Sequence, residues 1–174
     1  MKQAVPTIET RLGNLESKLD QILALLGEDA PARVTKAETP LAIPDGQDPP
    51  WLEKARVYLG IDEERDEDKV LALARDAGTP IDSSETPWCA IFVNGILAQC
   101  GLETTGTMRA RDFENYGQEC EERVGAIVVY RSHVGFVSEK GKVLGGNQSD
   151  GCNIGEQHWY GKPITYRFPD NYAV

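Results

Sequence analysis

Thr86-Pro-Trp-Cys-Ala-Ile-Phe-Val-Asn94 is the stretch that decides the fold, because it predicts a helix that starts with a thiol in its first turn. Thr86 is a candidate N-cap, since its hydroxyl oxygen can accept from an unpaired amide of that turn. Pro87 suits the first helical position, where its missing N–H is not needed. Cys89 would then lie near unpaired amides and the positive end of the helix dipole, which lower the pKa of a thiol. A buried structural cysteine is the alternative interpretation.

Helical patterns surround this stretch, and strand patterns follow them. Proline at the start and glycine at the end, or apolar residues at helical spacing, predict helices over 50–60, 67–77, 89–101 and 108–116. In the third helix, Val93, Ile96 and Cys100 are expected to pack on a sheet, with the Cys89 sulfur at the sheet edge. In the fourth, Arg109 and Arg111 are expected to be solvated surface residues.

The second half of the chain changes from helical to strand periodicity. β-branched residues and period-two alternation predict strands over 125–130, 133–138, 142–147 and 164–168. Lys140-Gly141 predicts a hairpin turn between the second and third of these strands. Helices followed by an antiparallel sheet indicate the α+β class.

Residues 1–27 carry a seven-residue apolar repeat. Its members alternate steps of three and four: Val5, Ile8, Leu12, Leu15, Leu19, Ile22 and Leu26. This spacing predicts a coiled-coil oligomerisation helix, and leucine-rich a positions with isoleucine at d favour a trimer or tetramer. An amphipathic helix that binds its own domain or another protein is the alternative. Residues 28–48 are rich in proline and acids, which predicts a linker and places the functional domain at 49–174.

The composition excludes several classes of function. The net charge of −10 argues against nucleic acid and anionic membrane surfaces as partners. No apolar run approaches the roughly 20 residues that span a bilayer, and the N-terminus has no signal-peptide pattern. The four cysteines have no metal-ligand spacing, so we expect free thiols, no metal and no cofactor.

A cysteine hydrolase needs a base beside the thiol and a polar group that orients the base. His133 begins a predicted strand and is the candidate base, whereas His158 lies in an aromatic loop and is expected at the surface or in a substrate groove. With the turn centred on Lys140-Gly141, the numbers of two residues that face each other across the hairpin sum to about 281. His133 is therefore expected to face roughly Gln148, with Asn147 adjacent. The carbonyl oxygen of Asn147 can accept from the imidazole and fix its tautomer. Gly145 and Gly146 allow close approach of other groups.

Several of these motifs, in this order, resemble the CHAP amidohydrolase/peptidase family among the NlpC-type and papain-like cysteine peptidases. They are Thr-Pro-Trp-Cys-Ala at 86–90, Gly-Ala-Ile-Val-Val at 125–129, His-Val-Gly-Phe-Val at 133–137 and Val-Leu-Gly-Gly-Asn-Gln at 143–148. The likeness is greatest to a phage and bacterial branch with the first and last of these signatures, and it covers about residues 49–168.

The resemblance implies a papain-like fold with Cys89 as nucleophile, His133 as base and Asn147 as the orienting residue. It also implies peptidoglycan as substrate, cleaved as an amidase or endopeptidase at the sugar–peptide amide or at a peptide bond. Many members carry an acid at or just before the third position, where this chain has Gly145 and Gly146 before Asn147.

An amide orients an imidazole but does not stabilise its cation as a carboxylate does. A weaker or more pH-sensitive base is therefore expected. Five further residues near these motifs are expected to contact substrate: Trp88, Glu85, Gln148, His158 and Trp159.

These features predict a cell-wall hydrolase on an oligomerising stalk, either an endolysin or a virion-associated lysin. It would be made in the cytoplasm and would reach the wall after lysis, after release or as part of a phage particle. One alternative is a structural or attachment protein of a virion that keeps the hydrolase fold without turnover. Another is a non-lytic peptidase that acts on protein substrates.

Overall fold

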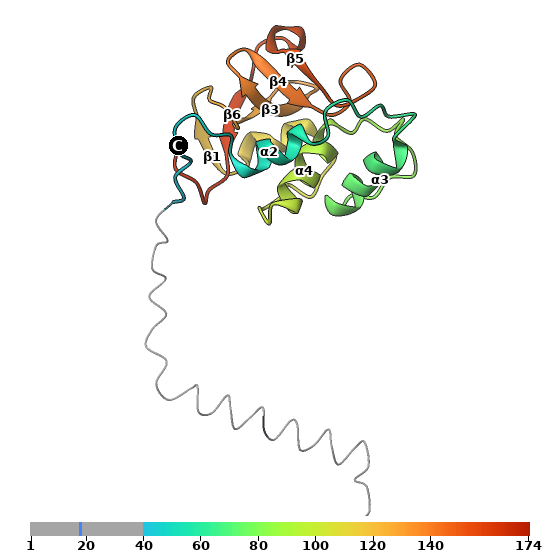
Figure 1. Ribbon diagram of the computed structural model, residues 1–174, viewed down its shortest axis with the longest axis horizontal. Coiled ribbons are helices and arrows are strands. Elements are labelled where there is room, and N and C mark those ends of the chain that lie inside the picture. The colour runs from blue at the N-terminus through green and yellow to red at the C-terminus, as the bar shows by residue number, and fades with distance from the viewer. Residues whose placement is uncertain (1–17, 19–39) are drawn as a thin grey trace, which may run out of the picture. The chain divides into compact units, whose positions relative to one another are not determined.

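The computed structural model describes Lys18 and residues 40–174 (Figure 1). Apart from Lys18, which is helical, the predicted coiled coil over 1–27 lies outside the described residues. The unit described below is the compact one that begins at Pro40.

Six strands form one antiparallel sheet in the order β1-β6-β2-β3-β4-β5. The strands are β1 (Gln118–Cys120), β2 (Ile127–Val129), β3 (Val134–Glu139), β4 (Lys142–Gly145), β5 (Asn153–Glu156) and β6 (Thr165–Phe168). β2 and β3 lie at the centre and are buried along nearly their whole length. The β3 strand, which follows His133, therefore belongs to the most enclosed part of the sheet.

The α-helices lie on one side of this sheet, as Figure 1 shows. They are α2 (Pro50–Arg56), α3 (Glu67–Asp76) and α4 (Cys89–Gln99). Two 3₁₀ helices, η1 (Ala110–Asn115) and η2 (Gln157–Tyr160), belong to the connections between strands and helices. α4 packs on β3 and β4, and α3 packs against α4. The predicted α+β class is confirmed.

α4 is more deeply enclosed than its sequence pattern predicts. Every residue from Cys89 to Leu97 is buried, so the helix is covered on all sides rather than along one face. Gly95 permits the close packing, because a Cβ there would lie 2.8 Å from the carbonyl oxygen of Leu73 in α3. The nucleophile candidate therefore begins a helix that runs through the core.

One helix boundary, one helix type and two strands differ from prediction. α2 ends at Arg56 and continues as turns to Gly60, and the fourth predicted helix is the 3₁₀ helix η1. Strands β1 and β5 were not predicted, because their short sequences lack a period-two pattern and are defined by pairing with β6 and β4.

Of the predicted linker over 28–48, residues 28–39 lie outside the described residues. Residues 40–48 belong to the compact unit, since the Leu41 N–H donates to the carbonyl of Asn171 at 2.8 Å and Asp48 pairs with Arg56.

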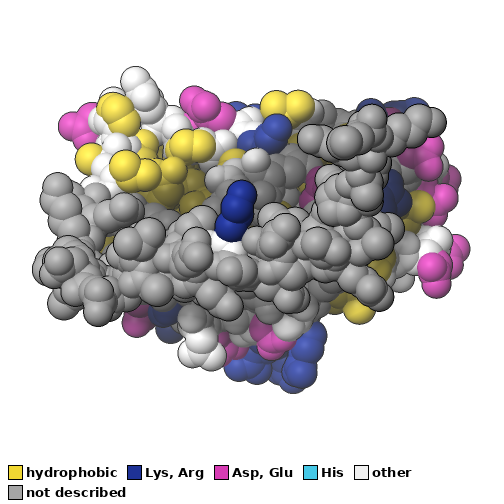
Figure 2. All heavy atoms as spheres, turned by 90° about the horizontal axis from the view of Figure 1, so that it is seen from below, with side chains coloured by type: hydrophobic (Ala, Val, Ile, Leu, Met, Phe, Trp, Pro, Cys, Tyr) yellow, Lys and Arg dark blue, Asp and Glu magenta, His cyan; other side chains and the backbone are white. Residues whose placement is uncertain are grey.

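Among the described helices, none is both long and apolar enough to cross a bilayer. Basic and acidic side chains occur together on the visible part of the face in Figure 2.

Candidate active site

Cys89 is the first residue of α4 and only 6% of its surface is exposed. The first helical hydrogen bond runs from the N–H of Phe92 to the carbonyl of Trp88 at 2.8 Å, so Trp88 is the N-cap residue. The predicted cap at Thr86 is wrong, because the backbone of Thr86 lies in a turn and donates to Ser83. Since no side chain caps α4, its first amides remain available to the site.

The Cys89 thiol faces the start of β3. The backbone N–H groups of Val134, the residue after His133, of Ala90 and of Cys89 itself lie close enough to the sulfur to act on its ionisation. These donors lower the thiol pKa, as predicted for a helix start, but burial raises it by more. The expected net lowering of the pKa is therefore corrected to a net rise.

His133 is buried immediately before β3, with 6% of its surface exposed. Burial lowers the pKa of its imidazole to about 4, so the ring is neutral at physiological pH. Its Nε2 atom is buried and has no hydrogen-bond partner among residues 40–174. A neutral, dehydrated imidazole beside a thiol is suited to take a proton during a reaction.

Tyr160 holds the imidazole of His133 in place. The two rings are stacked, with centroids 4.2 Å apart and planes 14° from parallel. The Tyr160 hydroxyl donates to Oε1 of Gln148, whose Nε2 donates to the Asn153 carbonyl at 2.9 Å. Gln148 is thus fixed at both ends of its amide and fixes Tyr160 in turn.

Gly145 provides the space in which His133 and Gln148 approach each other. A Cβ at this position would lie 3.1 Å from Nε2 of His133 and 2.8 Å from Nε2 of Gln148. The expectation that this glycine allows close approach is confirmed. Gln148 is 4% exposed, so it supports the site from within rather than contacting substrate.

Asn147 lies beyond the end of β4, and no hydrogen bond joins its side chain to His133. Within the hairpin, Glu139 faces Lys142, as predicted from the turn, but a bulge then shifts the pairing by one residue, so that Phe136 faces Leu144. The predicted pairing of His133 with the segment around Asn147 and Gln148 lies outside the paired residues of the two strands. Asn147 is half-buried with φ at +54°, and no bond of its side chain occurs within the described residues.

Trp88 supports the site from the core. Its side chain is fully buried, and its indole N–H donates to Oε2 of Glu63 at 2.7 Å. The ring packs against the backbone of Gly146, where a Cβ would lie 2.2 Å from Cζ3 of Trp88. The prediction that Trp88 contacts substrate does not fit this arrangement, because the ring presents no surface.

The other predicted contact residues are exposed and lie outside the cavity that contains Cys89. Glu85 lies in the loop before α4, and its N–H donates to the Ser83 hydroxyl. His158 and Trp159 lie on η2, and 65% of the Trp159 surface is exposed. Gln157 and Tyr160 of η2 face inward, and Tyr160, which stacks on His133, is a residue that the sequence does not single out.

A cavity of about 210 Å³ contains Cys89. Its lining comes from the start of α4, from η1 with the residues before it, and from the β2–β3 connection: Pro87, Cys89, Met108, Arg109, Ala110, Arg111, Arg131 and Ser132. Arg109 and Arg111 are exposed, as expected, but they line the same cavity as the nucleophile candidate. Only the tertiary structure brings them to the same cavity as Arg131.

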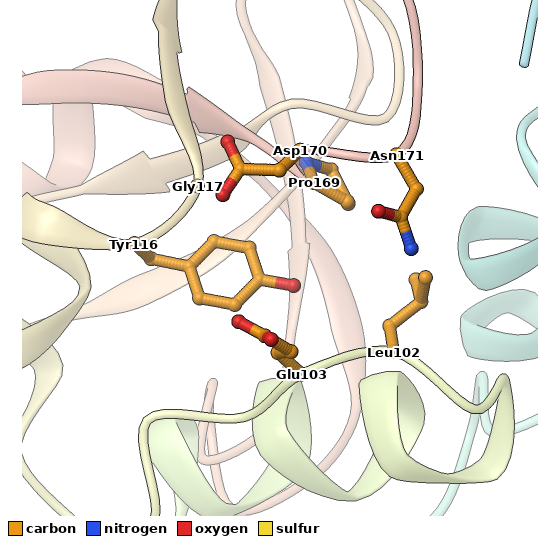
Figure 3. Close-up of a pocket in the computed structure, with 7 residues that line it drawn as sticks. All are labelled: Leu102, Glu103, Tyr116, Gly117, Pro169, Asp170 and Asn171. Carbon is orange, nitrogen blue, oxygen red and sulfur yellow. The ribbon is translucent and has the colours of Figure 1, made fainter. Parts of the chain in front are cut away.

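A second cavity lies away from Cys89 (Figure 3). It is narrow, about 60 Å³, and Figure 3 shows the Tyr116 ring close to the carboxylates of Glu103 and Asp170. Burial raises the pKa of Tyr116, and both carboxylates add to the rise. None of the predicted site residues lines this cavity.

Within the described part of the chain, no group of His, Cys, Asp and Glu side chains is arranged to hold a metal ion. All four cysteines lie in this part and are unpaired. In comparisons with known proteins, no family model and no curated protein matches the chain. The site is therefore interpreted from its own geometry.

The buried imidazole predicts a pH-dependent stability. An unfolded histidine has a pKa near 6.5 and His133 in the fold about 4, so the unfolded chain binds more protons between these values. The contribution of the neutral His133 to the free energy of unfolding is fully present above pH 6.5. It is lost as the pH falls toward 4, by up to about 3 kcal/mol. Urea unfolding across this range measures it, and the same series on His133→Gln removes this part of the slope. An unchanged slope in that variant would contradict the assignment.

Proposed function

We propose that the chain is a cysteine hydrolase that cleaves an amide bond in the peptide part of bacterial peptidoglycan, with a papain-like arrangement of its α+β fold. The observation that carries the proposal is the placement of Cys89 at a helix start without a side-chain cap, next to the backbone N–H of the residue that follows a buried, neutral His133. The ordered motifs of the CHAP-type resemblance support the same residues. Within that resemblance Asn147 is the third member of the triad.

The proposed reaction begins from a neutral thiol and a neutral imidazole, the state that burial favours for both groups. His133 takes the proton from Cys89 as the sulfur attacks the carbonyl carbon of the scissile amide. The carbonyl oxygen becomes an oxyanion, which the amides at the start of α4 stabilise. No cofactor enters this chemistry.

The tetrahedral intermediate then loses its amine. His133 gives its proton to the leaving nitrogen, the C–N bond breaks, and a thioester remains on Cys89. Water, deprotonated by the same imidazole, attacks the thioester and releases the carboxylic acid and the thiol. Tyr160 and Gln148 contribute by holding the imidazole in one orientation, and Asn147 by orienting it during turnover.

We further propose that residues 1–27 join several copies, as a trimer or tetramer, or attach the domain to a phage particle. Several catalytic heads on one assembly raise their effective concentration on a polymeric wall. This organisation suits an endolysin or a virion-associated lysin, made in the cytoplasm and acting on the wall after lysis or from the particle.

Digestion of purified sacculi by the wild type and by Cys89→Ala, with mass spectrometry of the products, tests the proposed function. Free stem peptides released only by the wild type would identify an amidase. Loss of cross-linked species with the sugars still attached would identify an endopeptidase. Intact sacculi with both proteins would overturn the proposal and favour a non-catalytic virion protein that retains the fold.

A further inference from the structure

The cavity beside Cys89 has a strongly biased charge. Three of its eight lining residues are arginines, Arg109, Arg111 and Arg131, and no acidic residue lines it. This concentration of positive charge stands out in a chain whose net charge is −10. Like charges brought together repel, so the arrangement favours an anion among them.

Carboxylate side chains of the described residues neutralise only part of the positive charge of these arginines. Arg111 pairs with Glu114, a residue outside the cavity lining. In the described part of the chain, Arg109 and Arg131 form no ion pair. Two arginines, one from the segment before η1 and one from the β2–β3 connection, thus line the cavity without a partner carboxylate among the described residues.

The size and position of the cavity define the group that it fits. Its volume of about 210 Å³ suits one small anionic group with the adjoining part of a peptide. Because Cys89 is part of the lining, that group would lie within a few bonds of the scissile carbonyl. A planar guanidinium binds a carboxylate through two parallel hydrogen bonds, a geometry that a carboxamide cannot match with the same charge.

We propose that Arg109, Arg111 and Arg131 bind a free carboxylate of the wall peptide beside the scissile amide, so that the enzyme selects stems with a carboxylate over stems in which it is amidated. The inference rests on the proposed function and specifies its substrate. Ser132, which also lines the cavity, supplies a hydroxyl for the second carboxylate oxygen.

The test uses two soluble wall peptides that differ only in one group, the α-carboxylate of the second stem residue or its carboxamide. The wild type is expected to cleave the carboxylate form with a kcat/KM at least about tenfold higher. Arg109→Gln and Arg131→Gln are expected to lose at least about tenfold on that form, mainly through KM, and little on the amidated form. Arg131→Lys is expected to recover part of the loss, because it restores the charge without the fork.

Arg75→Gln, an exposed arginine on α3 outside the cavity, is the charge-matched control and should keep the wild-type preference. Equal cleavage of both peptides by the wild type, or a preference that survives in the Arg109→Gln/Arg131→Gln double variant, would overturn the inference while the hydrolase remains. Cleavage of neither peptide would count against the proposed function instead. In that case calorimetric binding of the two peptides to the wild type decides the inference, with a carboxylate preference supporting it and equal affinities overturning it.

Discussion

His133→Gln is expected to lower turnover of wall peptides by about a thousandfold, because it removes the imidazole that we propose carries the Cys89 proton. Glutamine has a similar length and a polar amide, but it cannot act as a base. The imidazole it replaces is neutral in the fold and has no hydrogen bond at Nε2 to lose. The measurement is kcat/KM on a soluble muropeptide at pH 7.5.

The same variant should not be less stable than the wild type in mild acid, and this second readout separates chemistry from folding. At pH 5 the wild type bears the cost of keeping His133 neutral, whereas a glutamine at this position does not titrate. Retention of more than about a tenth of wild-type activity would contradict the role of His133. Loss of activity together with a large loss of stability at pH 7.5 would show a structural role only.

Gly146→Ala is expected to destabilise the fold by about 1–3 kcal/mol and to reduce turnover at least about tenfold. The added Cβ would lie 2.2 Å from Cζ3 of Trp88 and 2.7 Å from Cβ of Phe92, so the Trp88 ring must move. Trp88 directly precedes Cys89, and its movement displaces the start of α4. Urea unfolding and the muropeptide assay measure the two effects.

A double-mutant cycle with Trp88→Phe gives the control. Phenylalanine removes part of the ring that the new methyl group would strike, so the Gly146→Ala cost should be smaller in the Trp88→Phe background. If the losses in the free energy of unfolding of the two single variants simply add in the double variant, the new methyl group does not act through the Trp88 ring. Full stability of Gly146→Ala would contradict the tight contact between β4 and the start of α4.

The order of helices and central strands was predictable because those segments carry strong periodic patterns. β2, β3 and the hairpin turn follow from β-branched residues and Lys140-Gly141, and the register at the turn was also correct. The bulge between Val137 and Glu139 was not predictable, since it arises from pairing within the sheet. It shifts the pairing of Phe136 and Val137 by one residue from the register that the turn predicts.

The candidate site was also predictable only in part. Cys89 and His133 were identifiable as candidates from residue type and position, but the net direction of the pKa shift of the Cys89 thiol was not predictable. A helix start lowers a thiol pKa, yet the burial that reverses the shift depends on how α4 is enclosed by the whole fold. Tyr160 was missed because sequence does not show which residue of a 3₁₀ turn faces inward.

The arginines illustrate a further limit. Arg109 and Arg111 look like surface residues in sequence, and their side chains are exposed in the structure. Their relation to Cys89 exists only because η1 packs near β2 and β3, which brings the segment beside Arg131. A charge cluster assembled from two distant segments has no local pattern.

The most direct test of the central claim compares the amide-cleavage rates of Cys89→Ala and Cys100→Ala on the same soluble muropeptide. Both cysteines belong to the α4 region, but Cys100 lies at the opposite end of the helix from the cavity. The account predicts a loss of at least about a thousandfold for Cys89→Ala and near wild-type cleavage for Cys100→Ala. Near wild-type cleavage by a folded Cys89→Ala would contradict it.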